Sequence, residues 1–186
     1  ENTASNAVEK HCHCQCMLMI DDHSTGEYFT PDRPVWFMTK KLAGGGVSIN
    51  FGVHTLDRFC YLTGSSVASI TGSCTYRHQG SDVDGSAHFF LRAQSGVTGS
   101  VSISGYPSVP EEYTTLYLTK GAICIRPFVS VCKTTGGEYE LIDFSSFPGM
   151  FEAQMADFIT AMDTGSVLHY TGEEGKRYVE AISSIW

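Results

Sequence analysis

The sequence has no apolar run that could cross a membrane, since its longest one, CMLMI at residues 16–20, is far shorter than the ~20 residues that a membrane helix needs. Positive charge is also scarce, with 12 Lys and Arg against 20 Asp and Glu and a formal net charge of -8. Nucleic acids are bound by clustered Lys and Arg, so no nucleic-acid partner is expected. We expect a soluble chain without membrane contact.

Signs of secretion are absent as well. The sequence shows no secretory signal peptide and no Asn-x-Ser/Thr acceptor, and its seven cysteines cannot all pair. A reducing, cytoplasmic setting is therefore expected. What the chain does have is 186 residues, 42% of them hydrophobic and 12% aromatic, which suffices for one folded domain with its own core.

A stretch rich in histidine and cysteine, HCHCQC at residues 11–16, leads into CMLMI. Residues 8–20 have the composition of a strand, in which successive side chains point to opposite faces. The three cysteines would then lie on one face and the two histidines on the other. A zinc site needs four ligands that converge at about 2.0–2.3 Å, so we expect packed cysteines and no metal site, with zinc binding as the alternative.

Residues 21–43 are expected to form a long irregular connection, because they contain two prolines, a glycine and several turn-forming residues. Long loops in compact domains are often functional. Arg33 and Trp36 in this loop are therefore candidates for the wall of a binding pocket. The alternative is that Trp36 and Phe37 only cover one end of the core.

Residues 47–62, which follow a run of three glycines, have the periodicity of an amphipathic helix, and Gly64 has the usual position of a C-terminal cap. The polar face of this helix carries Asn50, His54, Asp57, Arg58 and Tyr61. Spacings of four and three residues make Asn50, His54 and Asp57 neighbours on one surface.

Residues 67–144 read as a series of strands separated by short turn signals: VASITGSCTYR, SAHFFLRAQ, VTGSVSISG, TTLYLT, AICIRPF and YELIDF. The first of them alternates between an apolar face and a face rich in Ser and Thr, which predicts a sheet covered on one side only. An uncharged Ser/Thr face suits contact with another subunit as well as with water, so we expect a homo-oligomer that assembles through the sheet face.

The chain closes with two predicted helices. The first carries an apolar stripe from Phe151 to Met162, and Thr171 with Glu174 forms a capping box at the start of the second. Residues 1–186 are therefore expected to form a single α+β domain, with a large, mostly antiparallel sheet and helices packed on one face.

GGGVSINFGVHTLDRFCYLTG, residues 44–64, resembles the substrate-domain helix of the Gfo/Idh/MocA oxidoreductase family: a glycine run, then Asp or Asn, then His four residues later and Asp three residues after that. DVDGSAHFFLRAQSGVTGSVSISG resembles the acidic loop and strands of the same family. MFEAQMADFITAMDTGSVLHYTGEEGKRYVEAISSIW is similar to its closing helices. The three stretches occur in the family's order and cover most of the chain.

The resemblance implies a cofactor that this chain does not hold. Full chains of the family join a Rossmann domain, which binds NAD or NADP, to a C-terminal substrate and oligomerisation domain, and only the second is matched here. No G-x-G-x-x-G follows a strand in this sequence, so no cofactor-binding residues are expected in it. Glu9 and Lys10 partly match the family's Glu-Lys-Pro motif, but His11 replaces the proline, and we interpret Lys10 as a strand-edge residue.

By this resemblance His54 is the acid–base residue in the oxidation of a carbinol, a task for which imidazole is well suited near pH 7. Asn50 takes the place of an Asp found in many relatives; because an amide cannot accept a proton, it would only orient the substrate hydroxyl. Asp57, Trp36, Arg33 and Tyr61 are candidate substrate-binding residues. From the residues alone, the favoured interpretation of His54 is a hydrogen-bonded histidine on a half-buried helix, and Asp57 could equally be an ion-pair partner of Arg58 or Arg33.

Two functions follow as hypotheses. The chain is the substrate-binding and catalytic domain of an NAD(P)-dependent dehydrogenase acting on a sugar, cyclitol or related polyol, and is inactive by itself. The alternative is a non-catalytic oligomerisation or binding module of the same fold.

Overall fold

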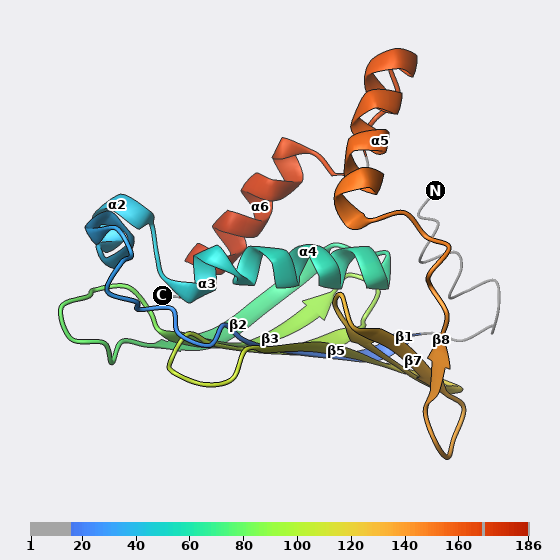
Figure 1. The fold of residues 1–186 in the computed structure, drawn as a ribbon, viewed down its shortest axis with the longest axis horizontal. Helices are drawn as coiled ribbons and strands as arrows, with labels where there is room; N and C mark the ends of the chain where they lie inside the picture. The colour runs from blue at the N-terminus through green and yellow to red at the C-terminus, as the bar shows by residue number, and fades with distance from the viewer. Residues whose placement is uncertain (1–15, 169, 186) are drawn as a thin grey trace.

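The computed structural model of the chain describes residues 16–168 and 170–185 (Figure 1). The predicted strand at residues 8–20 is therefore described only from Cys16 onward. Glu9, Lys10 and the HCHC part of the metal-like stretch lie outside the described residues, as does His169.

One sheet of eight strands runs through the whole fold, in the order β2-β3-β4-β1-β5-β6-β7-β8. Only β1 and β4 pair in parallel; the other neighbours are antiparallel. The strands are β1 Cys16–Ser24, β2 Val67–Thr75, β3 Ser86–Ala93, β4 Thr98–Ser104, β5 Glu111–Leu118, β6 Gly121–Arg126, β7 Ser130–Thr134 and β8 Glu140–Ile142. The predicted α+β class is confirmed, although β7 was not predicted as a separate strand.

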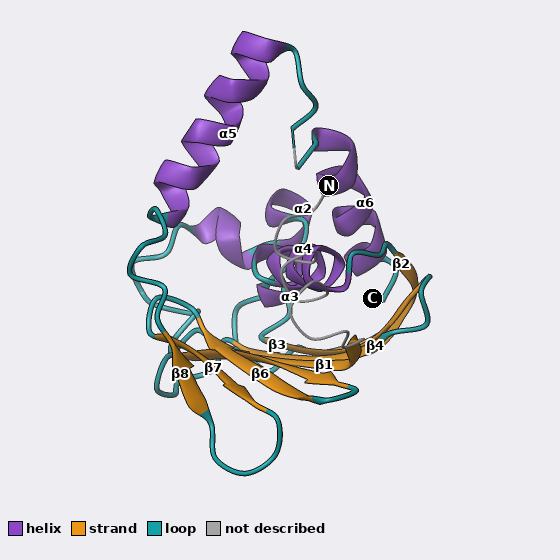
Figure 2. Cartoon of the chain, turned by 90° about the vertical axis from the view of Figure 1, so that its right-hand side faces the viewer, coloured by secondary structure: helices purple, strands orange, loops and turns teal. Residues whose placement is uncertain are grey.

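The helices all lie on one side of the sheet, and α4 runs along it (Figures 1 and 2). They are the 3-10 helix η1 Val35–Met38, α2 Lys40–Ala43, α3 Val47–Asn50, α4 Gly52–Thr63, α5 Met150–Thr164 and α6 Gly172–Ser183. The predicted loop at residues 21–43 thus holds two short helical segments, and β1 extends into its start.

The predicted single helix over residues 47–62 is interrupted at Phe51, which separates α3 from α4. The N–H of His54 donates to the carbonyl oxygen of Phe51 at 3.0 Å, a spacing of three residues where an α-helix has four. The Phe51 ring packs 4.7 Å from the His23 ring of β1. Gly64 ends α4 in the left-handed conformation with φ 61°, as predicted.

The core forms between α4 and the central strands. Leu56 and Phe59 of α4 are fully buried against Phe89, Leu91 and other side chains of the sheet. Each such side chain stabilises the fold by about 1.5–3 kcal/mol. Gly99 permits this packing, because a Cβ atom there would lie 2.8 Å from the Phe59 ring.

The run of three glycines allows the backbone at Gly46 to approach the backbone at Asp84 closely. A Cβ atom at Gly46 would lie 1.9 Å from the carbonyl oxygen of Asp84, so only glycine fits. The Asp84 carboxylate accepts hydrogen bonds from the N–H groups of Gly46 and Ser48, each at 2.8 Å, and so caps the start of α3. The acidic loop noted in the sequence therefore holds the segment that leads into α4.

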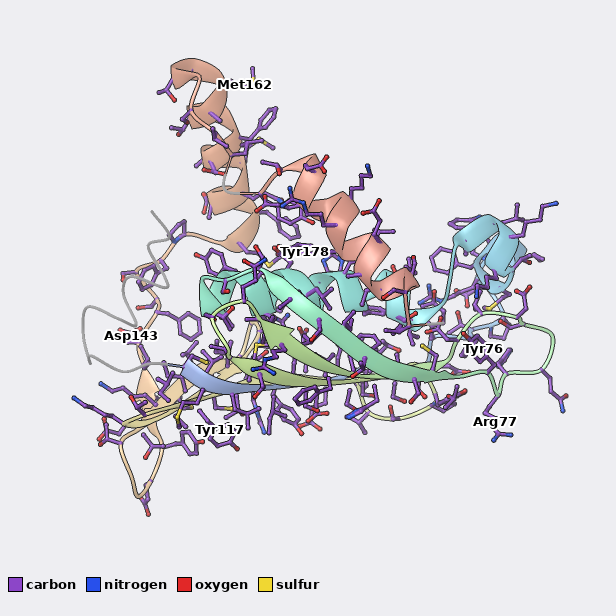
Figure 3. All side chains as sticks on the ribbon, turned by 180° about the vertical axis from the view of Figure 1, so that it is seen from behind. Tyr76, Arg77, Tyr117, Asp143, Met162 and Tyr178 are labelled. Carbon is purple, nitrogen blue, oxygen red and sulfur yellow. The ribbon has the colours of Figure 1, made fainter. Side chains whose placement is uncertain are left out.

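The two C-terminal helices differ in how they are packed. The capping box of Thr171 and Glu174 at the start of α6 is confirmed. Tyr178 of α6 lies between α6 and α4, whereas Met162 of α5 lies far from the sheet (Figure 3). The predicted apolar stripe of α5 is present, but its side chains are exposed: Phe151, Met155, Phe158, Ile159 and Met162.

Among the described residues, we find no helix with both the length and the apolar character that a membrane span requires.

Candidate active site

A cavity of about 470 Å³ opens beside His54, which is itself exposed. Its walls come from α4, from β1 and β5 of the sheet, from the turn between β6 and β7, and from the first residue of α5. We call it the His54 cavity. It is lined by His23, Phe51, His54, Thr55, Asp57, Arg58, Tyr61, Glu112, Pro127, Phe128 and Met150.

The structure brings three of the six candidate residues together. His54, Asp57 and Tyr61 all line the His54 cavity from α4. Asn50 is exposed on α3, and it is not among the residues that line this cavity. Its predicted role in orienting the substrate stays a prediction.

Arg33 and Trp36 lie elsewhere, in an aromatic cluster around Tyr28. The guanidinium carbon of Arg33 is 4.3 Å from the centre of the Tyr28 ring, and Trp36 packs on Phe37 with ring centres 4.5 Å apart. Neither residue is among those lining the His54 cavity. The contacts of Arg33 are those of a cation packed on aromatic faces, which stabilises the loop.

Asp57 stands between two cavities. It also lines, with Tyr61, a second cavity of about 440 Å³ between α4, β2 and α6. Burial raises the pKa of the Asp57 carboxyl above its ordinary value, while nearby His54 acts in the opposite direction. Asp57 thus lies beside His54 at the wall of the cavity.

Arg58, which points from α4 toward the sheet, makes its ion pairs with Asp21 and Glu112. Its Nη1 donates to Asp21 Oδ2 at 3.0 Å and to Thr114 Oγ1 at 3.1 Å, and its Nη2 donates to Glu112 Oε1. The sequence had suggested Arg58 as a partner for Asp57. The structure instead gives it two carboxylates on neighbouring strands, β1 and β5.

Asp21 is fully buried, with 0% of its surface exposed. Its Oδ2 accepts hydrogen bonds from Arg58 and Thr114, whereas Oδ1 has no hydrogen-bond partner among the described residues. Burial raises the pKa of the Asp21 carboxyl, and the Arg58 guanidinium partly offsets that rise. Arg58 is therefore the cation that makes a charged Asp21 tolerable in the interior.

His23 and Glu112 were not among the site residues predicted from the sequence. They are cross-strand neighbours on β1 and β5, and His23 Nδ1 lies 3.7 Å from Glu112 Oε1. The adjacent His23 imidazole and the hydrogen-bonded Arg58 guanidinium lower the pKa of the Glu112 carboxyl to about 2. Both side chains line the His54 cavity, so the sheet contributes a carboxylate to its wall.

Phe128 adds a strained residue to this cavity. It adopts φ 63°, in the left-handed region, where a bulky L residue is a genuine outlier and the conformation costs about 1–2 kcal/mol. The N–H of Val129 donates to the carbonyl oxygen of Arg126 at 3.0 Å, which closes a β-turn with Pro127 and Phe128 at its centre.

The fold and the cavity define an α+β domain with a solvent-open site between its helix layer and its sheet, a common place for small-molecule binding. A family model described as the GFO/IDH/MocA C-terminal domain matches residues 19–124. The chain belongs to this family, as the sequence resemblance predicted. A comparison with curated protein sequences gives no significant match.

Solved structures of oxidoreductases share the fold. Aldose-aldose oxidoreductase from Caulobacter crescentus, complexed with glycerol, has a TM-score of 0.83 at 20% identity over 98% of this chain and 56% of that one. Levoglucosan dehydrogenase, in complex with NADH and levoglucosan, has a TM-score of 0.85 at 15% identity over 99% of this chain and 59% of that one. An oxidoreductase domain protein from Kribbella flavida has a TM-score of 0.81 at 16% identity over 98% of this chain and 60% of that one. The chain thus spans only a little more than half the length of these proteins.

Proposed function

We propose that this chain is the substrate-binding and catalytic domain of an NAD(P)-dependent dehydrogenase that acts on a sugar, cyclitol or related polyol. The observation that carries the proposal is the exposed His54 at a cavity of about 470 Å³ that Asp57 and Tyr61 also line. A cavity of this size accommodates a monosaccharide, and its polar groups suit hydroxyls. The solved complexes of similar fold with glycerol and with levoglucosan and NADH support the same substrate class.

The described residues do not fit the phosphates of a dinucleotide. The glycine-rich start of α3 is the segment most like a phosphate cradle, but the Asp84 carboxylate already accepts hydrogen bonds from its Gly46 and Ser48 N–H groups. We therefore propose that NAD or NADP is held by residues outside this chain, with residues 1–186 forming one C-terminal domain. When bound, the nicotinamide would supply the acceptor for the hydride that leaves the substrate carbon.

The residues of this chain would supply proton transfer and orientation. Oxidation of a carbinol releases the hydroxyl proton, and the exposed imidazole of His54 would accept it from the hydroxyl oxygen. Asp57, three residues later on the same face of α4, would accept a hydrogen bond from a neighbouring hydroxyl of the substrate and so hold the substrate in position. Tyr61 would donate or accept a further hydrogen bond one turn along.

The test is an activity measurement on the protein expressed from its full reading frame. We expect it to reduce NAD or NADP in the presence of levoglucosan, L-sorbose or a related polyol, and the 186-residue chain alone to show no turnover. Binding of NAD by the 186 residues alone, with an affinity similar to that of the longer protein, would contradict the proposed division of labour.

A second role, assembly, is favoured by the open face of the sheet. Phe90 and Tyr117 are 51% and 42% exposed; Tyr117 points away from the helices (Figure 3), and Thr71 and Ser100 flank Phe90 on the adjacent strands. Exposed aromatic side chains among hydroxyl groups suit a subunit interface. We expect light scattering to give the mass of an oligomer, and the variant Phe90→Arg to shift it toward the monomer. A wild-type chain that is monomeric at every concentration would remove this role.

A further inference from the structure

The turn between β6 and β7 carries a residue that the turn itself does not favour. Phe128 is the only non-glycine residue with positive φ in residues 16–168 and 170–185. It follows Pro127 in a β-turn whose third position has positive φ, a position where glycine or asparagine forms the turn without strain. A phenylalanine at this position therefore strains the backbone of the turn.

Burial does not offset this strain. The Phe128 side chain is 81% exposed, so little apolar surface leaves water when the chain folds. Strained residues that persist without a packing reason gather at ligand-binding sites. Phe128 has such a site beside it, because it lines the His54 cavity together with Pro127.

The position of the ring within the cavity follows from these two facts. A side chain that lines a cavity and is also largely exposed stands at the rim. The cavity is also lined by His54 of α4 and by His23 and Glu112 of the sheet, which supply polar groups beside the turn. Pro127, His23 and Glu112 also line a neighbouring cavity of about 600 Å³, so the turn stands where the two cavities meet.

We propose that Phe128 is a specificity-determining residue: an aromatic platform at the rim that stacks on the C–H face of a sugar ring while one hydroxyl of that ring reaches His54. This inference rests on the proposed function. A pyranose ring has an apolar face of C–H groups with slight positive charge, and the face of an aromatic ring is slightly negative. An acyclic polyol has no such rigid face, so the platform discriminates in favour of cyclic substrates.

The test compares four proteins made from the full reading frame: wild type, Phe128→Gly, Phe128→Tyr and Phe147→Ala. Glycine removes the ring and relaxes the turn, whereas tyrosine keeps the ring. Phe147 is 72% exposed and is not among the residues lining the His54 cavity, so its variant controls for the loss of an exposed aromatic ring. The substrates are levoglucosan as the cyclic probe and glycerol as the acyclic one, and the stability of each protein is measured by urea unfolding.

In Phe128→Gly we expect the KM for levoglucosan to rise about tenfold with kcat changed less than about twofold, the KM for glycerol to stay the same, and the urea midpoint to be equal or higher. Phe128→Tyr is expected to stay within about twofold of wild type, as is Phe147→Ala. A Phe128→Gly protein with unchanged KM, or with a clearly lower urea midpoint, would overturn the inference and leave the proposed function standing. A wild-type protein that neither oxidises levoglucosan, L-sorbose or glycerol nor binds any of them in saturation-transfer NMR would overturn both.

Discussion

Replacing His54 by asparagine is expected to lower kcat of the full-length protein by roughly 10²- to 10⁴-fold, the usual contribution of a positioned acid–base residue. Asparagine is close to histidine in size and keeps hydrogen-bonding groups, but its amide cannot take up a proton. His54 is exposed, so the fold should tolerate the change. The loss should therefore appear in the chemical step, with KM altered much less than kcat.

Steady-state kinetics with levoglucosan, measured across pH, would check this result. The matched control is His88→Asn, because His88 is an exposed histidine on β3 that is not among the residues lining the His54 cavity. It should retain wild-type kcat. If His54→Asn kept the kcat of the wild type at every pH, His54 would have no part in proton transfer, and the proposed mechanism would be wrong.

Replacing Arg58 by methionine is expected to lower the free energy of unfolding by about 3–5 kcal/mol, because it leaves the buried Asp21 without its cation. Methionine keeps much of the length of the arginine side chain, so the loss comes mainly from the charge and the hydrogen bonds to Asp21, Thr114 and Glu112. Urea unfolding at about pH 7 gives the magnitude.

The pH dependence of this variant has a definite sign. Burial already raises the pKa of Asp21 above its value in the unfolded chain, and removal of Arg58 raises it further. Between the pKa of Asp21 in the unfolded chain and its raised pKa in the folded variant, the folded variant binds more protons than the unfolded chain. Its stability therefore falls as pH rises through this interval. We expect the defect at about pH 5 to be smaller than the defect at about pH 7.

Two further variants make the test specific. Arg126→Met removes an exposed ion pair to Glu111, whose closest atoms are 3.9 Å apart, and should cost about 1 kcal/mol or less. The double variant Asp21→Asn with Arg58→Met removes both charges and should recover part of the lost stability. If the double variant were less stable than Arg58→Met alone, the charge of Asp21 would not be the cause of the defect.

Local patterns in the sequence were sufficient for much of the fold. Several features depend only on residues that are close together in the sequence: the apolar side of α4, the glycine that ends it, the capping box of α6 and most strands. Such signals survive folding because they concern the backbone of one segment. The open, half-covered sheet also followed from the alternation of apolar and hydroxyl residues.

Long-range contacts account for what the sequence reasoning missed. The sequence around Gly46 does not indicate that Asp84, 38 residues away, caps α3. The sequence around Arg58 likewise does not indicate its hydrogen bond to Asp21, 37 residues away. The interruption at Phe51 has a similar origin, because its ring packs on His23 of another element. β7 is only five residues long and follows a tight turn, which gives it too little length for a visible alternation.

The candidate site divides in the same way. His54, Asp57 and Tyr61 share one face of one helix, and that face was predicted from spacing. The opposite wall, with His23, Glu112 and Phe128, comes from three elements whose register is set only when the sheet has formed. Arg33 and Trp36 were proposed from the composition of a long loop, which carries no information about direction, and their contacts lie with Tyr28 and Phe37.

The central place of β1 has a consequence for how the molecule is built. β2 to β4 and β5 to β8 form two antiparallel ribbons from segments adjacent along the chain, and β1 is the strand that joins them. During synthesis β1 leaves the ribosome before either ribbon exists, and β4 and β5, its partners among the described residues, are complete only once residues 98–118 have been made. Pairing β1 with β4 and β5 closes a long loop of the chain, which is a slow step in folding. Loss of this strand would separate the two ribbons, leave Arg58 without Asp21 and remove His23 from the wall of the His54 cavity.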